Sequence, residues 1–277
     1  MAFWTSFFSR GGPVIPLVRL TGAIGMTLPF RQGLSAASVE TPLSRAFAIK
    51  AAPAVAIVIN SPGGSAVQSH LIHRRIRSLA VEKRKQVIVA VEDVAASGGY
   101  LIALAGDEII VDAASIVGSI GVVSSGFGFQ KLIEKIGVER RVHTAGTSKA
   151  MLDPFRPEKA EDVARLEALQ RDVHAGFIDL VKARRGAALA DDPDLFTGAF
   201  WSGAKGVTLG LVDRVGDLRD VLRERYGDKV VIKPIAAERG FLRRRLGIPG
   251  SEAATSALVG QAAALLDERL LFGRYGL

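Results

Sequence analysis

The stretch Val94-Ala95-Ala96-Ser97-Gly98-Gly99-Tyr100 decides how this sequence folds. It follows the apolar run 87–91, which is typical of a buried strand, and it leads into the apolar helical run 100–105. A serine between small residues at a strand-to-helix junction can present its hydroxyl to a substrate, because small neighbours admit a substrate backbone and a helix N-terminus offers free N–H groups. Ser97 is therefore a candidate nucleophile, although the same pattern is as typical of a structural turn.

A second junction of this kind lies upstream. The apolar run 54–59 reads as a buried strand, and Asn60-Ser61-Pro62-Gly63-Gly64-Ser65 connects it to a long helical pattern. Gly63 and Gly64 allow backbone conformations that other residues resist, and they leave amides open to a ligand. An acyl-transfer enzyme needs such amides near the oxygen that becomes negative in the transition state. The alternative is an ordinary turn with a helix N-cap at Ser65.

A serine nucleophile needs a base, and none of the four histidines (His70, His73, His143 and His174) lies in a convincing triad context. His70 and His73 are three residues apart on a predicted helix, but no further ligand pattern accompanies them. A solvated helix face is favoured there, and we expect no metal and no cofactor. Lysine can act as a base when it is neutral, which requires desolvation or a nearby positive charge. Lys149 stands out as a lone cation among small and apolar residues, just before Pro154-Phe155.

Five short blocks follow one another along the chain: Asn60-Ser61-Pro62-Gly63-Gly64, Ala96-Ser97-Gly98-Gly99-Tyr100, Gly118-Ser119-Ile120-Gly121-Val122, Gly146-Thr147-Ser148-Lys149 and Gly210-Leu211-Val212-Asp213. With these blocks the chain resembles the signal peptide peptidase A family, the S49 serine peptidases, over residues 14–235. The resemblance implies an α/β fold, the ClpP/crotonase-like ββα spiral, with a single catalytic domain. One departure is that a serine precedes Lys149, where many members have an aromatic residue.

The resemblance also implies roles for individual residues. Ser97 would be the nucleophile and Lys149 the general base, forming a Ser-Lys dyad. Gly64 and Gly98 would supply the amides of the oxyanion hole, and Gly63 and Gly99 would bind the substrate. Relatives with one catalytic domain form rings or domes in which one protomer supplies the serine and its neighbour the lysine, so we expect a homo-oligomer with composite active sites.

The expected function is that of a serine endopeptidase that hydrolyses apolar, signal-peptide-like or unfolded peptides. Two alternatives remain open. A crotonase-like acyl-CoA enzyme shares the fold and also uses paired amides at an oxyanion, but it would not need Ser97 together with Lys149. A catalytically silent oligomeric scaffold would need neither residue.

The amino-acid composition limits the kinds of molecule that this protein is expected to bind. The chain has 277 residues, 48% of them hydrophobic, with a net charge of +8 and no cysteine, so disulfides and thiolate chemistry are excluded. The basic residues occur in short clusters without the aromatic platform or recognition-helix pattern of a nucleic-acid-binding protein, and we expect no nucleic-acid partner. Such clusters are typical of solvated helix faces, and anionic lipid headgroups are a second interpretation.

The N-terminal segment 1–8 is apolar but short, and Arg10 with Gly11-Gly12-Pro13 interrupts it. We find no run of about 20 apolar residues and no basic region before a sustained apolar one, so we expect no transmembrane segment, no usual N-terminal membrane anchor and no signal peptide. The aromatic cluster Phe3, Trp4, Phe7 and Phe8 fits either a membrane surface or docking on the protein itself. The expected location is cytoplasmic or peripheral on a membrane surface.

The pattern divides the chain into an N-terminal segment (1–13), an S49-like peptidase domain (14–235), and a basic segment with a C-terminal helix (236–277). Alternating strands and helices within the domain predict a mostly parallel sheet with covering helices. Among the expected elements are a helix over 38–51, a helix over 129–136, a strand over 138–143, a long helix over 157–185 and a helix over 252–272. The apolar stripe of the last helix predicts packing on its own domain or on a neighbouring subunit.

Overall fold

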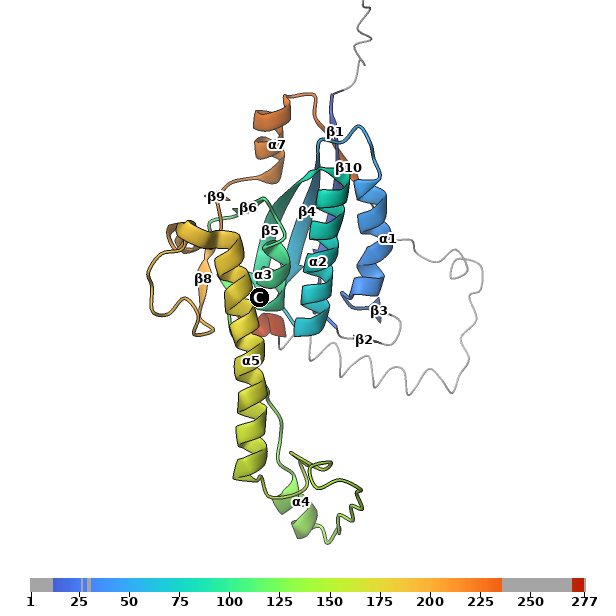
Figure 1. Cartoon of the computed structure of the whole chain (residues 1–277), viewed down its shortest axis with the longest axis vertical. Coiled ribbons are helices and arrows are strands. Elements are labelled where there is room, and N and C mark those ends of the chain that lie inside the picture. Colours follow the sequence, from blue (N-terminus) through green and yellow to red (C-terminus); the bar gives the residue numbers. More distant parts are fainter. Residues whose placement is uncertain (1–11, 26, 29–30, 236–270, 277) are drawn as a thin grey trace, which may run out of the picture.

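The chain is described from a computed structural model that places residues 12–25, 27–28, 31–235 and 271–276. Eight strands form one mostly parallel sheet, in the order β10-β1-β4-β5-β6-β9, with β7 paired to the end of β5 and β8 antiparallel to β7 (Figure 1). These strands are β1 (Val14–Thr21), β4 (Ala54–Ser61), β5 (Gln86–Ala96), β6 (Glu108–Val111), β7 (Ile116–Gly118), β8 (Phe200–Ser202), β9 (Arg214–Val215) and β10 (Val231–Pro234). A separate ribbon pairs β2 (Thr27–Leu28) with β3 (Arg31–Gln32).

Helices cover both faces of the sheet, as the alternation of strands and helices predicts. They are α1 (Ala36–Phe47), α2 (Ala66–Lys83), α3 (Gly98–Ala103), α4 (Gln130–Lys135), α5 (Ala160–Arg185), α6 (Gly203–Thr208) and α7 (Leu218–Tyr226), with one 3₁₀ turn (Gly186–Ala188). The helices α1, α2, α3 and the C-terminal part of α5 contribute to the larger core, and α7 packs on the opposite face. The expected fold class, an α/β fold of the ClpP/crotonase type, is confirmed.

The central strands are apolar on both sides because both of their faces are covered. In β4, Val55, Ile57 and Ile59 join the core of α1 to α3, whereas alternate residues, Ala54, Ala56 and Val58, belong to the cluster of α7. The parallel pairing of β4 with β5 ends at Ser61 and Ala95. Both strands therefore end at the same edge, and the loop after β4 lies beside the loop after β5.

An arm projects from this body (Figure 1). We use the term for residues 122–159, which include α4, together with residues 160–172 of α5. Phe177 and Val181 of α5 are buried in the core, but the thirteen residues before Val173 are exposed or half-buried. Thirteen helical residues rise by ~20 Å, so the arm extends well beyond the sheet.

The predicted strand over 138–143 is wrong. These residues lie in the arm, have no strand partner, and are mostly exposed. Val138 instead donates its backbone N–H to Ile133 and so ends α4. An apolar run forms a strand only where a sheet edge is available, and the arm provides none.

The predicted helix over 252–272 lies outside the described residues, except for its end. The described residues 271–276 begin with helical backbone and finish in a turn. Within the described part of the chain, no helix combines the length and the apolar content needed to cross a membrane.

Candidate active site

Ser97 occupies the junction between β5 and α3. Its backbone has φ 52° and ψ −120°, a conformation that non-glycine residues rarely adopt. The amide of Ser97 donates a hydrogen bond of 2.8 Å to the carbonyl oxygen of Gly118 at the end of β7. Its side chain is half-buried, and among the described residues the hydroxyl has no hydrogen-bond partner. Strain of this kind costs about 1–3 kcal/mol and persists where the surrounding structure holds it, which is common at active sites.

Glycines let the two loops approach each other closely. A Cβ atom on Gly63 would lie 2.8 Å from the Cβ of Ser97, and one on Gly64 would lie 2.2 Å from the carbonyl oxygen of Ile24. Both residues also have positive φ, 105° and 140°. Any larger residue at position 63 would push against Ser97, so this loop needs glycine for both space and conformation.

The next two glycines hold α3 against β4 and α2. A Cβ on Gly98 would lie 2.3 Å from Ser69 Oγ in α2, and one on Gly99 would lie 2.4 Å from the carbonyl oxygen of Ser61. Close packing here fixes the first turn of α3 against the neighbouring elements. Gly63, Gly98 and Gly99 are buried, whereas Gly64 is exposed.

Each of the two loops carries a glycine amide that has no hydrogen-bond partner among the described residues. Among the described residues, neither the amide of Gly64 nor that of Gly98 donates to another backbone or side-chain group. The two loops approach each other at Gly63, where a Cβ atom would lie 3.0 Å from the Gly98 nitrogen. Free N–H groups on converging loops beside a serine hydroxyl are what stabilisation of a tetrahedral oxyanion requires.

Lys149 lies on the arm, in the segment between α4 and α5. It is exposed, and its amide donates to the carbonyl oxygen of Gly146. The preceding Ser148 accepts a hydrogen bond of 3.2 Å from Arg165 of α5. Further along α5, His174 Nε2 lies 3.0 Å from the carbonyl oxygen of Ile120. Ile120 follows β7, the strand whose last residue accepts the hydrogen bond of the Ser97 amide.

Arg165 and His174 are nine residues apart, which corresponds to ~14 Å along the helix axis. The α5 residue that contacts the Lys149 segment and the one that contacts Ile120, just after β7, are therefore separated by about that distance along the helix. Within one chain, the structure does not bring the two predicted catalytic side chains together.

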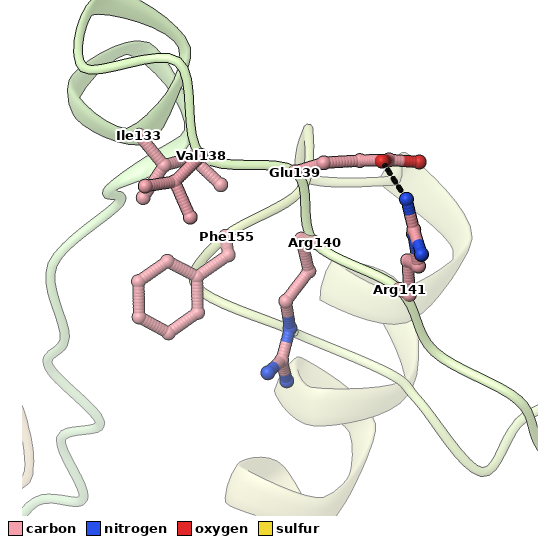
Figure 2. A pocket seen from close by; sticks show the side chains of 6 residues that line it. All are labelled: Ile133, Val138, Glu139, Arg140, Arg141 and Phe155. Carbon is pink, nitrogen blue, oxygen red and sulfur yellow. Dashed lines mark hydrogen bonds and ion pairs between the residues drawn. The ribbon is translucent and has the colours of Figure 1, made fainter.

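The same arm carries a pocket of about 540 Å³. Figure 2 shows the side chains that line it: Ile133, Val138, Glu139, Arg140, Arg141 and Phe155. The Arg140 guanidinium lies 5.2 Å from the centre of the Phe155 ring and donates a 3.3 Å hydrogen bond to Asp153. The backbone N–H of Phe155, together with Arg140, lowers the pKa of the Asp153 carboxyl. These contacts tie the segment that follows Lys149 to the irregular segment after α4.

His73 does not lie on a solvated helix face, as the sequence suggested. Its side chain is 6% exposed, and its Nε2 has no partner within the described residues. Burial, assisted by Arg184, His70 and Arg77, lowers the pKa of His73 to about 4. The spacing on the helix does not reveal this, because Leu104, the residue after α3, and Arg184 of α5 lie close to His73 only in the folded chain. In the described ranges no cluster of three possible metal ligands occurs.

The fifth sequence block supports α3 from its far side. The phenol of Tyr100 donates a 2.7 Å hydrogen bond to the carbonyl oxygen of Leu211, and burial raises the pKa of that phenol. Asp213 accepts from the Ile109 amide and pairs with Arg185 at 2.9 Å. The block thus fixes α3, the helix that follows Ser97, a structural role that its sequence alone does not disclose.

The fold is of the ClpP type: a family profile described as ClpP-like SDH-type serine proteinase matches residues 10–129, which include the serine junction. The profile described as Peptidase family S49 matches residues 80–231, more than half of the chain. The chain belongs to peptidase family S49.

Individual relatives agree with this membership. A putative protease of Synechocystis is 33% identical over 201 residues, which cover 70% of this chain and 72% of that protein. A Brucella abortus protein named Na(+)/H(+) antiporter NhaA is 58% identical over 273 residues, or 95% of this chain. The chain spans only 37% of the length of that relative.

Solved structures show the same fold at low sequence identity. Two mutant forms of a membrane-bound stomatin-specific protease match with TM-scores of 0.51 and 0.50 and with 15% and 13% identity. The matches cover 82% and 90% of this chain and 99% and 98% of those chains, and the second is a complex with a substrate peptide.

Proposed function

We propose that this chain is a serine endopeptidase in which Ser97 is the nucleophile and Lys149 the general base. The observation that carries the proposal is the backbone of Ser97, held at φ 52° with its side chain against Gly63 and its hydroxyl unpaired. Backbone strain of this kind is common at active sites, and here it occurs beside a loop that also offers free amides.

The proposed reaction begins when neutral Lys149 takes the proton of the Ser97 hydroxyl. The oxygen of Ser97 then attacks the peptide carbonyl carbon, and the amides of Gly64 and Gly98 stabilise the resulting oxyanion. Lysine returns its proton to the leaving amine as the peptide bond breaks. Water, activated by the same lysine, then hydrolyses the acyl-enzyme and frees Ser97. Gly63 and Gly99 line the strip along which an extended substrate backbone lies.

We further propose that Lys149 acts on Ser97 of a neighbouring copy. The ~14 Å offset along α5 separates the two residues within one chain, and a lysine base has to be desolvated to be neutral. Lys149 is exposed in the single chain, so a neighbouring subunit would have to cover it. A closed homo-oligomer, a ring or dome, gives every subunit the same arrangement.

Apolar residues on the arm support such an assembly. Within the described chain, several large apolar side chains of the arm are exposed: Val123 at 67%, Phe127 at 80%, Leu132 at 54%, Ile136 at 64% and Leu169 at 60%. Apolar residues gathered on a projecting element are typical of protein–protein contacts. We take the second copy of this chain as their partner.

The proposed substrates are apolar, signal-peptide-like or unfolded peptides. Small residues surround Ser97, which leaves room for an extended backbone and suits small or apolar side chains near the scissile bond. Peripheral contact with a membrane is part of the same proposal, and it depends on Phe3, Trp4, Phe7, Phe8 and the basic segment 239–245, all outside the described residues. The domain division at residues 13 and 235 also stays a prediction.

The antiporter activity in the name of the Brucella relative is not proposed for this chain. The S49 profile matches the chain itself, and the chain corresponds to only 37% of that relative. An acyl-CoA enzyme or a silent scaffold is likewise not favoured, because neither needs the strained conformation of Ser97.

A serine-reactive fluorophosphonate tests the proposal. We expect a single adduct, located on Ser97 by mass spectrometry, and no adduct on Ser97→Ala. The matched control is Ser78→Ala, an exposed serine of α2. Peptide hydrolysis that survives in Ser97→Ala, or turnover of an acyl-CoA thioester without peptide hydrolysis, would overturn it.

A further inference from the structure

The C-terminal turn, residues 271–276, docks directly behind the serine junction (Figure 1, red). Tyr275 is 9% exposed and, with Phe272, packs on Val94, Ala96 and Ile116. Its ring meets that of Phe200 edge-on, with centroids 5.0 Å apart. Its hydroxyl donates a 3.3 Å hydrogen bond to Ser119 Oγ.

These contacts lie on both sides of the hydrogen bond that holds Ser97. Ala96 is the residue before Ser97, and Ser119 is the residue after Gly118, whose carbonyl oxygen accepts the Ser97 amide at 2.8 Å. Ala96 and Gly118 are also register partners in the pairing of β5 with β7. Tyr275 therefore contacts both the residue before Ser97 and the residue after Gly118.

Two serines at or beside this bond have strained backbone conformations. Ser97 has φ 52° and Ser119 has φ 53°, two of only four non-glycine residues with positive φ in the described chain. Such conformations persist when neighbouring contacts over-determine them. The amide of Ser119 is fixed by the carbonyl oxygen of Ala199, and Tyr275 supplies the contact to its side chain.

We propose that Tyr275 is a positioning residue of the active site, which holds Ser97 in its reactive conformation through Ala96 and through Ser119. The inference rests on the proposed role of Ser97 and goes beyond it, because it places a residue 178 positions further along the chain in the support of the nucleophile. Tyr275 itself does not touch Ser97 and takes no part in the proton transfers.

Two other roles would give different results. If the C-terminal turn only covers an apolar patch, its loss would lower stability and leave the remaining folded sites fully reactive. If the turn fills a pocket that a substrate side chain needs, its loss would lower KM or raise activity. A positioning role predicts a lower rate of attack by Ser97 at unchanged KM.

The test compares Tyr275→Phe and Tyr275→Leu with the wild-type full chain. Phenylalanine keeps the ring and removes only the hydrogen bond to Ser119, whereas leucine removes the edge-on contact with Phe200 as well. Tyr226→Phe, on α7 at the opposite face, is the matched control. For each protein the fluorophosphonate labelling rate, kcat, KM and melting temperature are measured, with kcat normalised to the fraction of sites that label at completion.

We expect Tyr275→Phe to lower the labelling rate and kcat about fivefold, the factor that corresponds to about 1 kcal/mol, with KM unchanged. Tyr275→Leu should lower both further, and Tyr226→Phe should leave both unchanged. Wild-type labelling rate and kcat per active site in Tyr275→Phe would overturn the proposal, and so would a gain of activity in either variant.

If Tyr275→Leu fails to fold, Tyr275→Phe still decides the question, since it preserves the packing. The role of Ser97 is checked first with Ser97→Ala. An unlabelled, inactive Ser97→Ala confirms the nucleophile, and a later null result for Tyr275→Phe then contradicts only the positioning role.

Discussion

The carbonyl oxygen of Gly118 accepts the amide of Ser97 at 2.8 Å, and both residues have positive φ, 98° and 52°. This bond joins the end of β5 to the end of β7. It explains why the block that begins with Gly118 accompanies the serine block in the sequence. One block carries the hydroxyl, and the other holds the backbone that presents it.

Replacing Gly118 by alanine should disrupt the site. The new Cβ would lie 2.7 Å from the ring of Trp201, and the positive φ would add strain of about 1–3 kcal/mol. We expect Gly118→Ala to lower the fluorophosphonate labelling rate of Ser97 at least tenfold. Gly176→Ala is the control, because nothing lies within 4 Å of its Cβ position on the exposed side of α5. Equal labelling of both variants would contradict this view of Gly118.

The buried His73 predicts a dependence of stability on pH. Its pKa in the folded protein is about 4, below the ordinary histidine value of 6.5, so the unfolded state binds more protons between these two pH values. Stability should therefore be fully present above pH 6.5 and fall as the pH drops towards 4. The expected loss between pH 7.5 and pH 5 is about 2 kcal/mol.

Urea unfolding at the two pH values measures this loss. In His73→Gln the same comparison should show a smaller difference, because glutamine does not titrate, whereas substitution of the exposed His143 should leave it unchanged. A pH dependence that is identical in the wild type and in His73→Gln would show that other groups cause it.

The apolar arm should be needed for assembly. Phe127 is 80% exposed on the arm, and Val81 is 71% exposed on α2. We expect Phe127→Ser to shift the protein towards smaller species in light scattering, while the matched Val81→Ser stays assembled. Assembly that survives Phe127→Ser together with Leu132→Ser would place the contact elsewhere.

Replacement of Lys149 should remove activity without unfolding the protein, because its side chain is exposed. Lys149→Ala lacks a base, and Lys149→Arg should not restore activity, since a guanidinium stays charged at the pH of the assay. Peptide hydrolysis and melting temperature are measured together. Robust hydrolysis in Lys149→Ala would exclude the dyad and direct attention to the histidines.

The sequence predicts the centre of the fold well, for a physical reason. The strands β4 and β5 are buried on both faces, so their apolar runs carry a strong local signal, and the junction after each strand is readable from its small residues. The long helix α5 is equally evident from its periodicity. The local sequence pattern agrees with the structure wherever the buried residues belong to a regular helix or strand.

Other features depend on contacts between distant segments. His73 is buried close to Leu104, the residue after α3, and to Arg184 of α5. The missing strand over 138–143 reflects the absence of a sheet edge in the arm. The docking of Tyr275 behind Ser97 joins residues far apart in sequence. The offset of Lys149 from Ser97 likewise follows from the length of α5, which no single motif reveals.

Subunit complementation tests the central claim, that Ser97 and Lys149 of different copies form one active site. Inactive Ser97→Ala and inactive Lys149→Ala subunits carrying different tags are co-expressed, and mixed oligomers are purified through both tags. With equal amounts and random assembly, about a quarter of the sites would pair an intact Ser97 with an intact neighbouring Lys149. We predict hydrolysis at about that fraction of the wild-type rate, whereas mixed oligomers without activity would contradict a composite active site.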